Sequence, residues 1–239
     1  MALAAREIEY GDGDTLLTGV LVEEAATEGA CPGILLVHGG GGLDDHARGQ
    51  AQRYAQLGYT VFACDMYGEG VAGDRERVMA TLATLRDDPD VLVRRAQAGI
   101  DALTEHGHVN ERLGAVGFCF GGMCALTLAR AGLDLRGVVS MHGALKTPRL
   151  AEPGAVKAKV LACHGALDPH VPMTDVVAFV EEMEHAEVDY EVNIYGGAMH
   201  GFTHEHALPG AIHGVAYHAP SDRRSFAAAT AFFAEALPG

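Results

Sequence analysis

Residues 117–122 read Gly-Phe-Cys-Phe-Gly-Gly, and this stretch decides which fold the sequence predicts. It lies between an apolar run at 113–116, typical of a strand, and a run at 123–130, typical of a helix. A nucleophile on a sharp strand-to-helix turn needs very small residues two positions before and after it, because the backbones crowd together there. Glycines meet this need on both sides of Cys119. The stretch therefore indicates a nucleophile elbow that carries sulfur, with a glycine-rich turn around a buried cysteine as the structural alternative.

The rest of the chain alternates between strand-like and helix-like runs. Two strand-like segments at 6–10 and 16–23 flank a Gly-Asp-Gly-Asp connection, which is typical of an antiparallel hairpin. The alternation after it predicts a mostly parallel central sheet with helices on both faces, in one α/β domain over residues 1–239. The expected strands are 34–37, 59–64, 113–116, 137–141, 159–163 and 189–195, and the expected helices are 44–57, 74–86, 89–106, 123–130, 172–186 and a last helix capped by Ser221.

Composition narrows the classes of function. The formal charge of −15 at pH 7 argues against nucleic acid, whose phosphates require a basic surface, and against anionic membrane surfaces. No apolar run approaches the ~20 residues that span a bilayer, and the first residues lack the apolar core of a signal peptide. Five cysteines without a C-x-x-C pair favour neither a disulfide framework nor a zinc or thioredoxin-like site. We therefore expect a cytoplasmic protein.

Candidate catalytic residues follow the predicted strands, because sites in parallel sheets form beyond the carboxyl ends of strands. Asp168 comes after the strand at 159–163, and His200 comes after the strand at 189–195. The order Cys119, Asp168, His200 is the nucleophile–acid–base order of α/β-hydrolases. Asp-Pro turns are common and the chain has 13 histidines, so neither partner is informative alone. Together with the elbow they predict an α/β-hydrolase fold with a Cys-His-Asp triad.

Such a triad requires an oxyanion hole and a pocket for the substrate. The amide of Phe120, the residue after the nucleophile, is one expected oxyanion donor. The second is expected from the four glycines that follow the strand at 34–37, where Gly40 is the candidate and Gly39 the alternative. Four residues at strand ends or beside the elbow are expected to line the substrate pocket, namely His38, Tyr67, Phe118 and His142.

Three other chemistries have weaker support. The glycine run lacks the G-x-x-x-x-G-K-[ST] pattern of a phosphate loop and the pattern of a dinucleotide site. The three serines, Ser140, Ser221 and Ser225, all lie outside an elbow, which argues against a serine hydrolase. A histidine-rich region suggests a metal, but no carboxylate at a familiar zinc-helix spacing accompanies it, so no metal and no cofactor are expected. That region contains His200, His204, His206, His213 and His218.

Four segments carry a resemblance to a known family. They are Asp65-Met66-Tyr67, the elbow at 117–122, His164-Gly165 leading to Asp168, and His200-Gly201-Phe202. With them the chain resembles the dienelactone hydrolase family over nearly its full length. The resemblance implies an α/β-hydrolase fold and hydrolysis of a small-molecule ester or lactone through an acyl-thioester intermediate. We expect such a protein to be a monomer or a homodimer.

Two positions depart from the family pattern. The founding enzymes have a glutamate directly after the residue that matches His38, where it helps to activate the cysteine, and Gly39 stands there in this chain. They also have an arginine four residues after the catalytic histidine, which holds the carboxylate of dienelactone, and His204 stands there instead. We therefore expect a different ester as substrate. The activating role is expected to pass to His200 with the helix dipole, or to another acid such as Glu69.

Alternatives remain open at this level. Arg75 and Arg77 are either a replacement clamp for a substrate carboxylate or residues of a helix surface. The same triad would also serve an acyltransferase or an amidase, because the acyl-enzyme is shared and only the acceptor differs. A third possibility is a non-catalytic redox sensor in which Cys119 is oxidised rather than acylated.

Overall fold

The computed structural model describes residues 2–25 and 29–238. Within these ranges the chain forms one eight-stranded sheet in the order β1-β2-β4-β3-β5-β6-β7-β8. The hairpin of β1 (Leu3–Asp12) and β2 (Thr15–Glu24) is antiparallel, β2 also pairs antiparallel with β4, and the remaining pairs are parallel. The other elements are β3 (Cys31–Val37), α1 (Asp45–Ala55), β4 (Thr60–Cys64), α2 (Arg75–Asp87), α3 (Pro89–His106), β5 (Val109–Phe118), α4 (Phe120–Arg130), β6 (Gly137–Met141), β7 (Lys159–Gly165), α5 (Met173–His185), β8 (Tyr190–Tyr195) and α6 (Ala219–Ala236).

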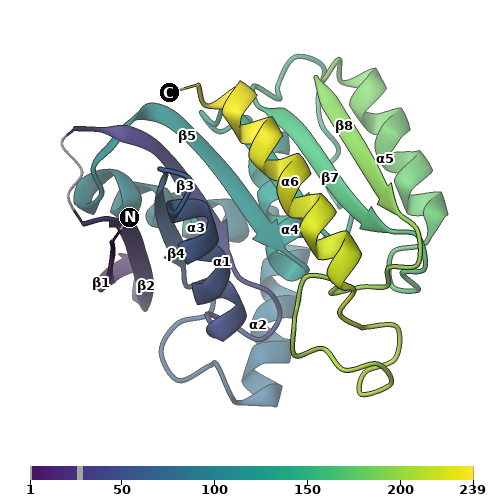
Figure 1. Cartoon of the computed structure of the whole chain (residues 1–239), viewed down its shortest axis with the longest axis horizontal. Helices are drawn as coiled ribbons and strands as arrows, with labels where there is room; N and C mark the ends of the chain where they lie inside the picture. Colours follow the sequence, from purple (N-terminus) through teal and green to yellow (C-terminus); the bar gives the residue numbers. More distant parts are fainter. Residues whose placement is uncertain (1, 26–28, 239) are drawn as a thin grey trace.

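Helices cover both faces of this sheet, as the apolar strand pattern predicts. Successive side chains of β3 point to opposite faces, and each is fully buried: Ile34 and Leu36 pack with α1 and α6, whereas Leu35 and Val37 pack with α3 and α4. Figure 1 shows α6 lying across the sheet, with the loop between β8 and α6 extending beyond the carboxyl ends of the strands. The structure therefore has the α/β-hydrolase architecture expected from the sequence.

The register of the central strands brings their carboxyl ends to one edge. Val37 of β3 pairs with Gly117 of β5, and Phe118 at the end of β5 pairs with Met141 of β6. The residues that follow these strands, among them Cys119 and His142, therefore leave the sheet side by side. This is the edge where parallel sheets bind ligands.

Several elements begin or end a few residues from the predicted bounds, and β5 and the last helix are two of them. β5 begins at Val109 instead of residue 113, because its first part pairs with Cys31 of β3. The predicted cap of the last helix is wrong: α6 begins at Ala219, and Ser221 is buried in its first turn, where Oγ lies 2.7 Å from His218 Nδ1. Proline at residue 220 fits this first turn because its missing N–H would have no helical partner there. No helix of the described ranges is long and apolar enough to cross a bilayer.

Candidate active site

The turn between β5 and α4 holds Cys119 in a conformation that side chains rarely adopt. Its backbone angles are φ 54° and ψ −112°, in the left-handed half of the map. The flanking glycines permit this turn. A Cβ at Gly117 would lie 1.8 Å from the carbonyl oxygen of Gly121, and a Cβ at Gly121 would lie 2.1 Å from that of Val37. The sequence pattern therefore has a direct steric cause, and the turn presents the thiol at the N-terminus of α4.

Cys119, His200 and Asp168 form one hydrogen-bonded chain across the carboxyl edge. His200 Nε2 lies 2.9 Å from Cys119 Sγ, and His200 Nδ1 lies 2.8 Å from Asp168 Oδ2. The other carboxylate oxygen, Asp168 Oδ1, accepts hydrogen bonds from the amides of His170 and Val171 at 2.8 and 3.1 Å. Because these amides fix the carboxylate, the imidazole has one preferred orientation between acid and thiol. The three residues that the sequence predicted as a triad lie together.

The contact between Cys119 and His200 lowers the pKa of the thiol and raises the pKa of the imidazole. Burial would raise the pKa of Cys119, but the hydrogen bond and charge of His200, with the amides of Phe120 and Gly40, lower it below 9.0. Burial would lower the pKa of His200, but Asp168 and Cys119 raise it from 6.5 to about 10. A thiolate and an imidazolium therefore stabilise each other, and they titrate as a pair.

The pKa values of the other buried cysteines shift in the opposite direction. Burial raises the pKa of Cys163 to about 12, and it raises the pKa of Cys64 and of Cys124 further above the ordinary value. None of these three has an imidazole partner among its charge neighbours. They behave as small apolar residues, and Cys119 differs from them through its contacts.

The glycine loop after β3 is fixed by residues that we expected to find on the pocket wall. Tyr67 donates its hydroxyl to the carbonyl oxygen of Gly40 at 2.9 Å. His38 Nδ1 donates to the carbonyl oxygen of Gly39 at 2.7 Å, while His38 Nε2 accepts from the amide of Met66 at 3.1 Å. These bonds leave the loop's carbonyls pointing into the protein, which suits a loop whose amides face the thiol.

A cavity of about 400 Å³ opens over the thiol. Phe118 and His142 line it, as expected from the sequence. His38 and Tyr67 do not line it, and their predicted place on the wall is wrong, because both are bound to the backbone of the glycine and β4 loops. The lining comprises Gly39, Gly40, Gly41, Asp44, His46, Phe118, Cys119, His142, His200, Gly201, His204, His206, Ala207, Ile212 and Val215.

A second hydrogen-bonded chain runs behind the elbow. The amide of Cys119 shares its hydrogen between the carbonyl oxygen of Met141 at 2.9 Å and His142 Nδ1 at 3.1 Å, so His142 accepts at Nδ1, carries its proton on Nε2 and donates to Thr203 Oγ1 at 2.9 Å. Thr203 Oγ1 lies 3.2 Å from His46 Nε2. Burial lowers the pKa of His142 well below 6.5, which keeps it neutral and preserves these roles. No motif marks Thr203 or His46 in the sequence.

The other residues considered from the sequence lie away from the thiol. Arg75 is exposed, and Arg77 donates to the carbonyl oxygen of Gly70 at 2.6 Å, so neither lines the cavity. Glu69 is also exposed and outside the lining. At the position of the family glutamate, a Cβ on Gly39 would lie 3.8 Å from the Cβ of Cys119. A side chain there would reach the nucleophile, and this chain has none.

Comparison with known proteins identifies the family of this chain. The family model described as the dienelactone hydrolase family matches residues 17–237. This chain belongs to the dienelactone hydrolase family. Its relatives include an uncharacterised Caenorhabditis elegans protein, 37% identical over 60% of this chain and 92% of that protein. Another is a Bradyrhizobium protein named as a probable 2-oxo-3-(5-oxofuran-2-ylidene)propanoate lactonase, 28% identical over 74% of this chain and 75% of its own length.

Two solved structures match this dienelactone hydrolase family member over their entire length. The protein m3DLH is 38% identical and superposes with a TM-score of 0.93 over 99% of this chain and 100% of its own. A dienelactone hydrolase-like promiscuous phosphotriesterase from metagenomic libraries is 35% identical, with the same TM-score and the same coverage. As a member of the dienelactone hydrolase family, the chain is a carboxylic ester or lactone hydrolase.

Proposed function

We propose that this hydrolase cleaves a small neutral ester or lactone through a Cys-His-Asp triad and an acyl-thioester intermediate. The supporting observation is the chain of 2.9 and 2.8 Å contacts from Cys119 through His200 to Asp168, beside a cavity that opens over the thiol. Nucleophile, base and orienting acid are the parts that acyl transfer through a covalent intermediate requires.

In this mechanism the thiolate of Cys119 attacks the carbonyl carbon, and the carbonyl electrons move to oxygen. The amides of Phe120 and Gly40 hold that oxyanion, since both already contact the thiolate. As the tetrahedral intermediate collapses, the leaving oxygen takes the proton from His200 Nε2 and departs as an alcohol. His200 then removes a proton from water, the resulting hydroxide attacks the thioester, and the acid leaves with return of the thiolate.

The cavity lining favours a neutral substrate over an anionic one such as dienelactone. Among the described residues that line it there is neither lysine nor arginine, and Asp44 contributes a negative charge. Phe118, Ile212 and Val215 supply apolar surface. The imidazolium of His200 is already paired with Cys119 and Asp168, so a substrate carboxylate would lose its hydration without gaining an unpaired cationic partner, which is unfavourable.

Substitution of the nucleophile tests the proposal. Cys119→Ala is expected to abolish turnover of a short-chain activated ester, because no attacking group remains. Cys124→Ala is the matched control, since Cys124 is fully buried in α4 and its substitution leaves the thiolate pair in place. Turnover by Cys119→Ala within a few-fold of wild type would overturn the assignment, provided that both variants fold as judged by circular dichroism.

A panel of substrates distinguishes the hydrolase from an acyltransferase and an amidase. Comparison of ester, lactone, thioester, amide and phosphotriester substrates, each with and without an added acyl acceptor, distinguishes hydrolysis from acyl transfer and amide cleavage. Trapping with an acyl probe separates the enzyme from a redox sensor. An adduct on Cys119 that requires His200 supports the hydrolase, whereas reaction with peroxide alone supports the sensor.

Cytoplasmic location, a monomeric or homodimeric state and the absence of a nucleic-acid partner stay predictions.

A further inference from the structure

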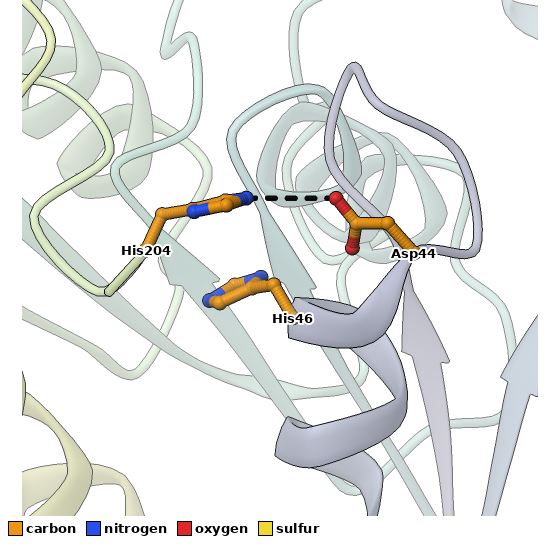
Figure 2. Close-up of side chains that lie close together, drawn as sticks. All are labelled: Asp44, His46 and His204. Carbon is orange, nitrogen blue, oxygen red and sulfur yellow. Dashed lines mark ion pairs between the residues drawn. The ribbon is translucent and has the colours of Figure 1, made fainter. Parts of the chain in front are cut away.

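A cluster of potential metal ligands lies at the rim of the cavity. One atom each from Asp44, His46 and His204 lies within 4.8 Å of the others, and Figure 2 shows the two imidazoles one above the other with the carboxylate beside them. All three side chains line the cavity that contains the thiol. We propose that these residues bind one divalent transition-metal ion, such as Zn²⁺, beside the hydrolytic centre.

Asp44 is held as a metal ligand needs to be held. Its Oδ1 accepts the amide of Ala47 at 3.0 Å as the N-cap of α1, so the carboxylate has a defined direction. Its Oδ2 lies 3.5 Å from His204 Nε2, and the Asp44 side chain as a whole is about one-third exposed. One oxygen therefore fixes the side chain while the other is available for a cation.

His46 is held in one orientation by its surroundings. His46 Nε2 lies 3.2 Å from Thr203 Oγ1 and 3.4 Å from Gln50 Nε2, which leaves Nδ1 as the nitrogen for coordination. Thr203 accepts from His142, and its second lone pair can accept from His46 Nε2–H when Nδ1 binds a metal.

His204 must turn for all three ligands to meet one ion. Its ring is stacked on that of His46, with centroids 4.7 Å apart and planes at 13°, whereas a metal lies in the plane of each imidazole that binds it. Tetrahedral ligands at Zn–N and Zn–O distances of about 2.0–2.1 Å are roughly 3.3 Å apart. The rotation gives up the stacking on His46 and the edge contact with His206, but it breaks no hydrogen bond of Nδ1, which has no partner among the described residues. The side chain is 36% exposed.

The ligand set determines which ions fit. Two imidazoles and one carboxylate suit Zn²⁺, Co²⁺ or Ni²⁺ better than Mg²⁺ or Ca²⁺, which prefer oxygen ligands. Three protein ligands leave a coordination position for water or for a ligand in the cavity. The ion would also reverse the charge at the rim, where Asp44 is the one acidic side chain among the described lining residues.

The test measures metal binding in a protein that lacks the nucleophile, because Cys119 with His200 would itself bind Zn²⁺. In the Cys119→Ala background, calorimetric titration with ZnCl₂ is expected to show one site, and Co²⁺ is expected to give a visible absorption band of a nitrogen-ligated ion. Adding His204→Gln is expected to weaken Zn²⁺ binding at least tenfold and to abolish the band. His206→Gln is the matched control, because His206 lines the same cavity outside the cluster, and it is expected to leave both signals unchanged.

Two results would overturn the site. One is the absence of Zn²⁺ binding in the Cys119→Ala protein, and the other is equal affinity with and without His204. A second variant, Asp44→Ser, retains a side chain that caps α1 while it removes the carboxylate, and it too is expected to lose affinity. Because the readout is binding by an inactive protein, its failure is separate from any failure of the proposed hydrolytic mechanism.

Discussion

His200 and His46 line the same cavity and differ in the charge that they carry. Burial disfavours the charged form of both rings. His200 lies between the carboxylate of Asp168 and the thiol of Cys119, and its pKa rises to about 10. His46 lies against the hydroxyl of Thr203 and a second imidazole, and its pKa falls to about 4.

The difference shows that contact partners, rather than burial, decide what a histidine does here. Anionic partners on both ring nitrogens make His200 an imidazolium that can donate a proton. Burial keeps His46 an imidazole with a lone pair, because no carboxylate or thiolate of the described residues is hydrogen-bonded to its ring to offset the burial, and this is the form that binds metals. One cavity therefore holds a proton donor and a potential metal ligand of the same residue type.

Removal of the anionic partner of His200 gives the largest expected effect. Asp168→Asn is expected to lower kcat by about 10³- to 10⁴-fold, because the amide neither stabilises the imidazolium nor selects the correct tautomer. Thiolate absorbance near 240 nm, measured as the difference from Cys119→Ala, should fall at neutral pH. Asp175→Asn is the control, since Asp175 is a buried carboxylate paired with Lys146 outside the cavity. If Asp168→Asn and Asp175→Asn had the same kcat, the role of Asp168 as the anionic partner of His200 would be contradicted.

The pH dependence of the rate tests the charge of His200 directly. Its pKa is raised to about 10, so the imidazolium is present at neutral pH and is lost only as the pH rises through that value. We expect kcat/KM to fall by about tenfold per pH unit above pH ~10 as the general acid disappears. The stability that the raised pKa contributes is likewise complete below 6.5 and lost by about 10. An alkaline limb that begins near pH 7 would show that His200 is an ordinary histidine.

Removal of the neutral partner of His46 gives the smallest expected effect. Thr203→Val takes the hydroxyl from two imidazoles, that of the buried His142 and that of the half-buried His46. We expect the free energy of unfolding to fall by about 1–3 kcal/mol, because a buried donor loses its acceptor. Urea denaturation measures the change, and Thr203→Ser, which retains the hydroxyl, is expected to restore most of the loss. A Thr203→Val protein as stable as wild type would mean that the network carries no stability.

The local parts of the site could be predicted from the sequence because they depend on neighbours in the chain. The glycines around Cys119 are required by atoms within four residues and by β3, so they leave a motif. The order of Asp168 and His200 follows from the succession of strands. The pocket wall was predicted less well, since His38 and Tyr67 follow strands as expected but turn toward the backbone of neighbouring loops.

The rim cluster could not be predicted, because its members come from distant parts of the chain. The histidines between 200 and 218 have no carboxylate at a familiar zinc-helix spacing, and for this reason the sequence predicted no metal. The structure places Asp44 and His46, at the start of α1, next to His204 in the loop before α6. No spacing rule connects residues that lie about 160 positions apart.

The sequence by itself determined the family, the parallel sheet and the residue that carries the sulfur, because steric crowding and strand order act along the chain. Only the tertiary structure decided the charge of each histidine and the residues that surround the cavity. A pKa depends on burial and on the charges within a few ångströms, and packing between α1, the elbow and the loop before α6 sets both.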